Sequence, residues 1–333
     1  MAVNKKGCQK GASLLTELIK DGDKIVLGVS GGPDSICMLD MLRELKEKQT
    51  IKFEIYVAHI NHMIREEAVD DEKYVQDYCK KHNIECYVKR VDVQQIAQCK
   101  KIGTEEAGRE VRYSFFEEVL QKTGSNKIAI AHNKNDKIET IIMHLLRGSG
   151  LSGLKGIEAE RENKYIRPLI ECERQEIEEY CREKNLNPRI DKTNFENVYT
   201  RNKIRNIVIP YIKKEFNPNI IQTLSRLSDL ATEESDYIEI QVKKIYQEIL
   251  IKKEEKQIVL KLKEFNNKEK LIQGKLILNA IKELMGSTEK IEKVHIEDII
   301  KLCNNNVGNK YLTPNKNLKV LVKEKKIFFI NLK

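Results

Sequence analysis

The six residues Ser30–Ser35, with the sequence SGGPDS, have the types and spacing that most clearly indicate chemistry in this chain. They stand between an apolar run at 24–29 and an apolar segment at 36–45, which predicts a strand, a glycine turn and a helix start. That order points the first N–H groups of the helix and its positive dipole end at the turn. The sequence therefore predicts a phosphate-chain site at Ser30, Gly31, Gly32, Pro33, Asp34 and Ser35.

Two common phosphate loops do not fit this turn. A Walker P-loop needs a lysine, and the dinucleotide fingerprint needs a further glycine, and the turn has neither. The turn is similar to the SGGxDS pyrophosphate loop of ATP-pyrophosphatases, which split ATP between its α and β phosphates and adenylate a substrate oxygen. A carboxylate beside phosphates needs a cation, so we expect Asp34 to bind Mg²⁺. The alternative, a plain strand-to-helix turn, gives no packing reason for Gly-Gly-Pro-Asp-Ser.

Charge and composition restrict the class of protein. The 333 residues include 60 Lys and Arg against 51 Asp and Glu, a net charge of +9, which favours a polyanionic partner. The N-terminal residues are charged, and no segment has the 18 apolar residues of a membrane span. The eight cysteines form no CxxC pair, which is typical of thiols in a reducing compartment. We expect a cytoplasmic protein with no membrane association.

The first half of the sequence alternates apolar strands with amphipathic helices. Strands are expected at 24–29, 53–60, 84–93 and 127–132, and helices near 36–45, 66–82, 104–122 and 135–147. This alternation predicts an α/β fold, a Rossmann-like parallel sheet covered by helices on both faces. Ligands of such sheets bind beyond the carboxyl ends of the strands. The polar segments at 30–35, 58–65 and 131–140 should therefore meet in one crevice.

The second half changes character. Four glycines predict a flexible loop at 148–156, and an edge strand is expected at 165–170. A long charged helix should run to about 255, and short strands and helices follow it. We therefore divide the chain into a catalytic ATPase domain at 1–215, a helical connector at 216–255 and a small α+β domain at 256–333.

Six segments occur in the order seen in tRNA(Ile)-lysidine synthetases. They are SGGPDS, AHINHMIREEA, EEAGREVRY, AHNKNDKIETIIMHLLRGSGLSGLKGI, IRPL and TRNKIRNIVIP. The chain resembles this family densely over about 20–215 and in outline beyond it. The resemblance implies an ATP-dependent ligase of the PP-loop superfamily. Such an enzyme adenylates the wobble cytidine of tRNA(Ile) with a CAU anticodon, attaches L-lysine at C2 and releases AMP and diphosphate, so that the tRNA decodes AUA instead of AUG.

Asp136 and Glu139 lie three residues apart at the start of an expected helix and share one of its faces. By resemblance they match the carboxylates that bind the lysine ammonium, and such groups can also accept its proton. Outside this context, a solvated first helical turn would explain the pair equally well. The chain departs from the family at Asn135 and Lys137, where relatives usually have Asp and Gln. An amide cannot neutralise an ammonium, so we assign lysine binding to Asp136 and Glu139.

Arg112 and Arg205 match functional arginines of the family, and with Asp34 they are the expected catalytic residues. An arginine can stabilise negative charge on the α-phosphate and on leaving diphosphate. A single arginine is more often plain surface charge, and the family pattern supports Arg109 less than the other two.

The remaining candidates concern RNA. His59 and His62 are spaced like metal ligands, but no full zinc set accompanies them, which favours a loop that faces phosphate or the anticodon. His132 either lines the nucleotide crevice or simply ends a strand. Basic residues between 147 and 205 would position the tRNA, and the domain at 256–333 would bind its stem. The expected tRNA contacts are His59, His62, Arg65, Arg147, Gly148 and Gly150.

Two alternatives stay open at this point. Another PP-loop enzyme such as a tRNA thiolase has the same loop, although thiolases typically use paired or catalytic cysteines. A catalytically silent tRNA-binding protein could retain the fold, although the intact loop and carboxylates argue against it. The oligomeric state is open, and a homodimer is one option.

Overall fold

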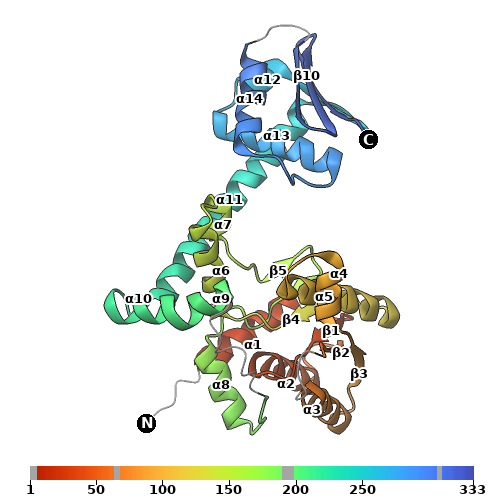
Figure 1. Ribbon diagram of the computed structural model, residues 1–333, viewed down its shortest axis with the longest axis vertical. Coiled ribbons are helices and arrows are strands. Elements are labelled where there is room, and N and C mark those ends of the chain that lie inside the picture. The colour runs from red at the N-terminus through yellow and green to blue at the C-terminus, as the bar shows by residue number, and fades with distance from the viewer. Residues whose placement is uncertain (1–5, 64–67, 190–198, 306–309) are drawn as a thin grey trace. The chain divides into compact units, whose positions relative to one another are not determined.

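The computed structural model describes residues 6–63, 68–189, 199–305 and 310–333. The chain divides into two compact units, Met1–Ala231 and Thr232–Lys333 (Figure 1). In the part of the chain that is described, no helix is both long and apolar enough to cross a membrane.

The first unit is built on a six-stranded sheet with the order β3-β2-β1-β4-β6-β5. Neighbouring strands are parallel except β5 and β6, so the predicted parallel α/β sheet is confirmed. The strands are β1 Lys24–Gly28, β2 Glu54–Asn61, β3 Glu85–Arg90, β4 Lys127–Ile130, β5 Glu160–Arg161 and β6 Tyr165–Ile166.

The prediction of an edge strand at 165–170 is wrong. β6 has two residues and lies inside the sheet, because β5 folds back antiparallel and becomes the edge. Positive φ angles at Glu162 and Asn163 make the tight turn between them. Pro168 comes two residues after β6, where its missing N–H cannot continue a ladder.

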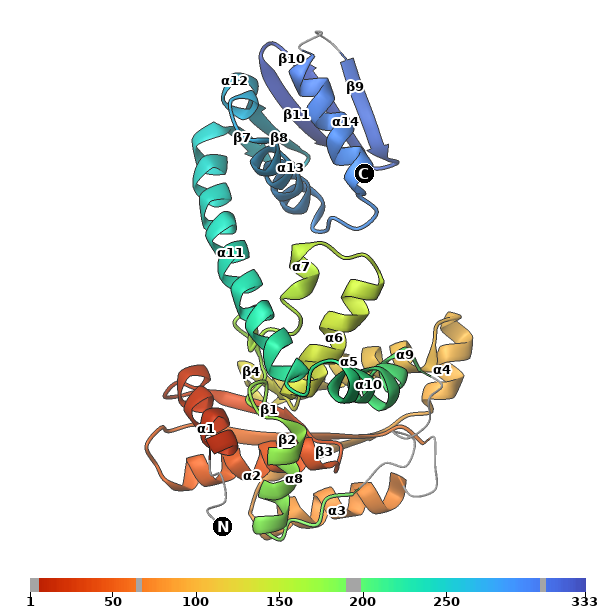
Figure 2. The same ribbon diagram turned by 90° about the vertical axis from the view of Figure 1, so that its left-hand side faces the viewer.

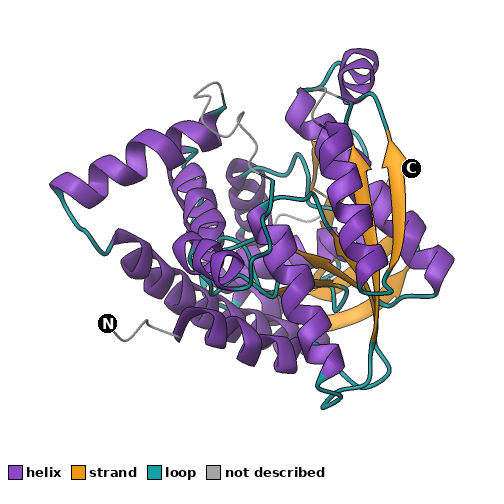
Figure 3. Ribbon diagram, turned by 90° about the horizontal axis from the view of Figure 1, so that it is seen from below, coloured by secondary structure: helices purple, strands orange, loops and turns teal. Residues whose placement is uncertain are grey.

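Helices cover both faces of this sheet (Figure 3). Side chains alternate along β1, so Ile25 and Leu27 join a core with α2 while Val26 packs with Phe115 and Phe116 of α5. The helices of this unit are α1 Lys6–Leu18, α2 Pro33–Glu47, α3 Ala68–Lys81, α4 Val93–Lys100, α5 Thr104–Thr123, α6 Lys134–Leu146, α7 Leu151–Leu154, α8 Arg174–Glu183, α9 Thr200–Lys203, the π-helical turn Ile204–Val208, α10 Ile209–Glu215 and the start of α11 Ile220–Ile249.

The segment 148–156 is not all loop, as we expected, because Leu151–Leu154 form the short helix α7. A Cβ on Gly153 would lie 2.5 Å from the Ser149 Cβ and 3.1 Å from the His144 Cβ. The Gly153 carbonyl also lies 2.9 Å from the His144 ring nitrogen Nδ1. The role of Gly153 is therefore to let the backbone of α7 come close to α6, and it is not to make the segment flexible.

A separate apolar cluster joins α6 to the chain that follows the catalytic sheet. It contains Ile138 and Ile141 of α6, Ile204 of the π-helical turn and Ile221 of α11. Ser228 of α11 donates a hydrogen bond to the Lys155 carbonyl at 2.8 Å, just after α7. This packing places the π-helical turn against α6.

The second unit has a five-stranded antiparallel sheet, β7-β8-β11-β10-β9. The helix expected to run to about 255 ends at Ile249, because Leu250–Glu254 pair with the next strand as a hairpin. Alternate residues of β10 are buried under α13 and α14, so the expected α+β architecture is confirmed (Figure 2). The further elements are β7 Leu250–Glu254, β8 Gln257–Lys261, α12 Leu262–Asn266, α13 Lys270–Met285, α14 Lys293–Asn304, β9 Lys310–Asn315, β10 Leu318–Lys323 and β11 Lys326–Asn331.

Candidate active site

The SGGPDS turn joins β1 to α2 as the sequence predicts. Gly31 has φ +93°, a backbone conformation that residues with a side chain rarely adopt. Gly32 is the N-cap of α2. The Ser35 hydroxyl lies inside the turn, where it accepts hydrogen bonds from the N–H groups of Ser30 (3.1 Å) and Gly31 (3.2 Å). It donates to the Gly32 carbonyl at 3.0 Å. Ser35 therefore braces the loop, and the glycines and the helix end provide the approach for a phosphate.

Asp34 connects this loop to the second polar segment. The Asn133 side-chain amide donates to the Asp34 carboxylate at 3.0 Å. Asn133 is also the N-cap of α6, where its oxygen accepts from the Asp136 N–H and its own N–H donates to the Asp136 carboxylate, both at 3.0 Å. The expected convergence of the ends of β1 and β4 is thus confirmed.

Asp34 is an unusual carboxyl group. Burial and the nearby Asp136 carboxylate together raise its pKa to about 6, against the opposing effect of Arg174. A carboxyl group that is disfavoured in its charged form, in a polar turn beside a second carboxylate, is typical of a functional site.

Arg205 lies between the two carboxylates of α6. Its Nε donates to Glu139 at 2.6 Å, and its Nη2 donates to Glu139 at 2.8 Å and to Asp136 at 2.9 Å. Glu139 is 1% exposed, and burial raises its pKa even with this partner. Arg205 comes from the π-helical turn, a local irregularity that is frequent at functional sites. The sequence analysis assigned Asp136 and Glu139 to lysine binding and Arg205 to catalysis. In the structure these three side chains form one hydrogen-bonded group.

Arg112 lies on another side of the same region. Its side chain is exposed and donates to the Gly108 carbonyl at 3.3 Å. Neighbouring protein desolvates the guanidinium and lowers its pKa, and the positive charges of Arg109 and Arg201 add to this effect. Burial likewise lowers the pKa of His132 to about 4, so this ring is neutral at pH 7.

The departures from the family pattern have structural partners. The Asn135 side-chain oxygen accepts the Arg174 N–H at 3.0 Å, which satisfies the first free amide of α8. The Lys137 ammonium pairs with Asp229 of α11 at 3.0 Å. Both side chains therefore stabilise packing around α6.

Asn135→Ala should lower the free energy of unfolding by about 1 kcal/mol, the usual cost of removing an acceptor at a helix N-terminus. Turnover should stay within about twofold, since the carboxylates keep their partners. Thermal unfolding and steady-state kinetics measure the two effects, and Asn135→Asp, which keeps the acceptor, is the control. A tenfold fall in turnover at unchanged stability would contradict this role.

The expected RNA contacts lie in different settings. His59 is 2% exposed, and its Nδ1 lies 2.9 Å from the Val29 carbonyl, so it is buried on the interior strand β2 rather than on the surface, and the predicted RNA contact at His59 is wrong. Burial lowers the pKa of His62 to about 4. Arg65 lies outside the described residues. Arg147, Gly148 and Gly150 are all exposed at the end of α6 and the start of α7.

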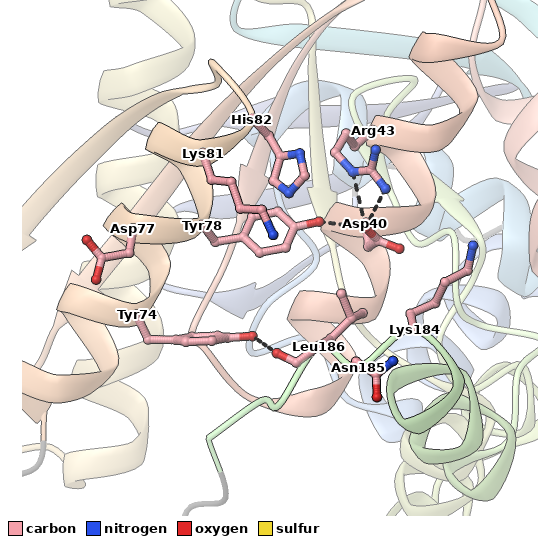
Figure 4. Close-up of a pocket in the computed structure, with 10 residues that line it drawn as sticks. All are labelled: Asp40, Arg43, Tyr74, Asp77, Tyr78, Lys81, His82, Lys184, Asn185 and Leu186. Carbon is pink, nitrogen blue, oxygen red and sulfur yellow. Dashed lines mark hydrogen bonds and ion pairs between the residues drawn. The ribbon is translucent and has the colours of Figure 1, made fainter.

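A pocket of about 350 Å³ is lined by residues of α2, of α3 and of the segment that follows α8 (Figure 4). None of the expected site residues lines it. Asp40, a buried carboxylate, accepts hydrogen bonds there from two tyrosines. The Tyr74 hydroxyl donates to the Leu186 carbonyl, and three residues later the Arg189 N–H donates to the Gly31 carbonyl at 3.0 Å. The segment that follows α8 is therefore bonded both to α3 and to the phosphate loop at Gly31, and it helps to fix the position of that loop.

Sequence reasoning missed several members of the site. Asn133 could have been found, because Asn followed three residues later by an acidic side chain is a helix-start signature. Arg174 and Arg201 have no local signal, and they reach the site only through the packing of α8 and α9.

Comparison with known proteins agrees with this geometry. A family model described as PP-loop domain matches residues 5–212. Together with the loop at Ser30–Ser35 and the parallel sheet, it defines an ATP-binding protein of the PP-loop class.

Curated relatives identify the family within this class. The chain is 45% identical to the tRNA(Ile)-lysidine synthase of Clostridioides difficile, covering 94% of this chain and 68% of the relative. It is 49% identical to that of Clostridium acetobutylicum, covering 90% of this chain and 64% of the relative. The chain belongs to the tRNA(Ile)-lysidine synthase family, and it spans about two thirds of the length of these relatives.

Among solved structures, the U34-tRNA thiolase NcsA of Methanococcus maripaludis has a TM-score of 0.54 at 18% identity. The match covers 67% of this chain and 78% of the thiolase. At this level of identity the likeness shows a common fold.

Proposed function

We propose that this chain ligates L-lysine to C2 of the wobble cytidine of tRNA(Ile) with a CAU anticodon, using ATP. The observation that supports this most is the hydrogen bond from Asn133 to Asp34. It joins the phosphate loop to the helix that presents Asp136 and Glu139, so an ammonium bound by these carboxylates would lie close to a phosphate bound by the loop. The 43–49% identity to named lysidine synthases favours this function over a thiolase or a silent RNA-binding protein.

The reaction takes two steps. Cytidine O2 attacks the α-phosphorus of ATP, the bond to the bridging oxygen breaks, and diphosphate leaves. The lysine ε-amine, once it has lost a proton, attacks C2; the C2–O2 bond then breaks, and AMP leaves with the oxygen. Adenylation is needed because O2 alone is a poor leaving group, and the proton must be removed because an ammonium has no free electron pair.

Asp34 would bind Mg²⁺ in this scheme. Carboxylate oxygens are ligands that Mg²⁺ prefers, and a cation there would offset the burial and the Asp136 charge that raise the pKa of Asp34. The bound ion would offset the charge of the phosphates. The Ser30–Ser35 loop would hold the diphosphate end of ATP.

The other roles follow from charge. Asp136 and Glu139 would attract the lysine ammonium, and the raised pKa of Glu139 suits a group that accepts a proton. Arg205 holds both carboxylates and would be close to the α-phosphate, while Arg112 would stabilise the charge that develops there. His62, Arg147, Gly148 and Gly150 remain candidate RNA contacts, and the residues at 256–333 would hold the tRNA stem.

The test is diphosphate release from ATP with lysine and an unmodified tRNA(Ile) transcript that has a CAU anticodon. Release should depend on both lysine and this tRNA, and tRNA(Met), which has the same anticodon, should support much less. Release that ignores lysine but needs a sulfur donor would overturn the proposal in favour of a thiolase. RNA binding with no turnover would overturn it in favour of a silent binder.

A further inference from the structure

A group of arginines and tyrosines on α5 and the β5–β6 hairpin is unused by the scheme above, apart from Arg112. The Arg109 guanidinium lies 5.2 Å from the centre of the Tyr113 ring. Arg161 lies 4.6 Å from the Tyr165 ring and 5.9 Å from the Tyr113 ring, and the two rings are 5.5 Å apart. We define the arginine–tyrosine cluster as Arg109, Arg112, Tyr113, Arg161, Tyr165 and Arg167.

Arg167 is the buried centre of this cluster. It is 5% exposed, and it donates to the Glu158 carbonyl at 2.6 Å and to His132 Nδ1 at 3.3 Å. Its surroundings include Tyr113 and the positive charge of Arg161, and burial lowers its pKa. A buried guanidinium is normally paired with a carboxylate, because an unpaired charge away from water is costly.

Three of the four arginines of the cluster have no carboxylate at ion-pair distance among the described residues. Within the described ranges, Arg109, Arg112 and Arg167 form no ion pair with any carboxylate. Arg161 lies 3.3 Å from Glu162, but that carboxylate is two thirds exposed, and such surface pairs contribute little. The carboxylates of Glu105 and Glu158 act on Arg112 and Arg167 only from beyond ion-pair distance. Three guanidiniums without an ion pair around one buried position indicate a site for an anion.

The chemistry of the cluster favours an RNA backbone over a small anion. Arg109 and Arg112 are exposed while Arg167 is buried, so the charges extend from the surface inward as a phosphodiester chain would require. Guanidinium planes and tyrosine rings also provide faces on which unpaired bases stack, which is typical of single-stranded RNA sites.

The position of the cluster connects it to the reacting centre. Arg167 donates to His132, and the next residue, Asn133, holds both Asp34 and Asp136. The phosphates of ATP would bind at the Ser30–Ser35 loop. In the series of contacts from Arg167 through His132 and Asn133 to Asp34, this loop comes last, so it lies at the opposite end from the cluster. A phosphate bound at the cluster would therefore flank a base that is presented at Asp34 and Asp136.

We propose that the arginine–tyrosine cluster binds the ribose-phosphate backbone beside the wobble base and positions that base for adenylation. This inference rests on the proposed function, since it takes the anticodon loop as the RNA.

Arg109→Ala is the first test, because an exposed side chain can be removed without disturbing the core. The Kd for a tRNA(Ile) anticodon stem-loop should rise about 3- to 10-fold, and the slope of log Kd against log salt should fall by about 0.7–0.9, the value for one lost phosphate contact. KM for ATP and for lysine should not change. Arg182→Ala, which removes an exposed arginine of α8, is the matched control and should leave every value unchanged.

Arg167→Lys is the second test, since it keeps the charge and removes the planar fork. It should weaken stem-loop binding about 10-fold with less change in the salt slope than Arg109→Ala. A rise in KM for ATP or lysine with unchanged RNA affinity in both variants would overturn the inference, and so would no change at all. Binding is measured without turnover, so a failure of lysine-dependent diphosphate release would be recognised separately from a failure of this site.

Discussion

Asp34→Ala is expected to lower lysine- and tRNA-dependent diphosphate release by about 10²–10³-fold, the usual effect of losing one charge-stabilising group in a reacting centre. Asp34 adjoins the phosphate loop and is held by Asn133, and the RNA backbone contacts proposed above do not involve its side chain. The Kd for tRNA should therefore stay within about twofold of the wild-type value. Single-turnover diphosphate release and filter binding measure the two effects. Near-normal release by the variant would remove Asp34 from the mechanism.

The raised pKa of Asp34 adds a stability test of the same site. The carboxyl group has a pKa of about 6 when folded against an ordinary value of 3.8, so its ionisation opposes folding increasingly above pH 4 and fully above pH 6. Asp34→Asn should therefore raise the free energy of unfolding at pH 8 without ligands, by at most about 3 kcal/mol. The gain should shrink as the pH falls through 6 and vanish near pH 3, below both pKa values, where the carboxyl group is protonated in both states. Urea unfolding at these pH values provides the measurement, and equal gains at pH 3 and pH 8 would exclude ionisation as the cause.

Glu139→Gln is expected to raise KM for lysine and to lower turnover by about 10²-fold or more, because the charge that attracts the ammonium and accepts its proton is lost. The variant should also lose about 2–3 kcal/mol of stability, since Arg205 loses its two charge-assisted hydrogen bonds to Glu139. Lysine titrations of diphosphate release and urea unfolding measure the two effects.

The double variant Glu139→Gln with Arg205→Gln separates structure from chemistry. Removing both charges should restore much of the stability, because no unpaired guanidinium is left beside α6. It should not restore lysine-dependent turnover. Recovery of turnover in the double variant would mean that Glu139 serves only to hold Arg205, and the lysine site would then be elsewhere.

Much of the first unit could be predicted from local sequence. The glycine turn at Ser30–Ser35, the alternation of strands and helices, and the shared face of Asp136 and Glu139 depend on residues close together in the chain. Errors arose where local pattern competed with packing. The glycines of 148–156 favoured the prediction of a loop. In the structure, Gly153 belongs to the helix α7, and the close approach of α7 to α6 leaves no room for a side chain at this position.

The sequence by itself determined which chemical groups are present and at which strand ends and helix starts they stand, because backbone propensity and side-chain periodicity act over a few residues. Only the tertiary structure decided their partners. Arg205 meets Glu139 across 66 residues, and Asn133 meets Asp34 across 99. The arginine–tyrosine cluster likewise forms only when the β5–β6 hairpin packs beside α5. Such contacts depend on how buried surfaces fit together, and no local pattern specifies that fit.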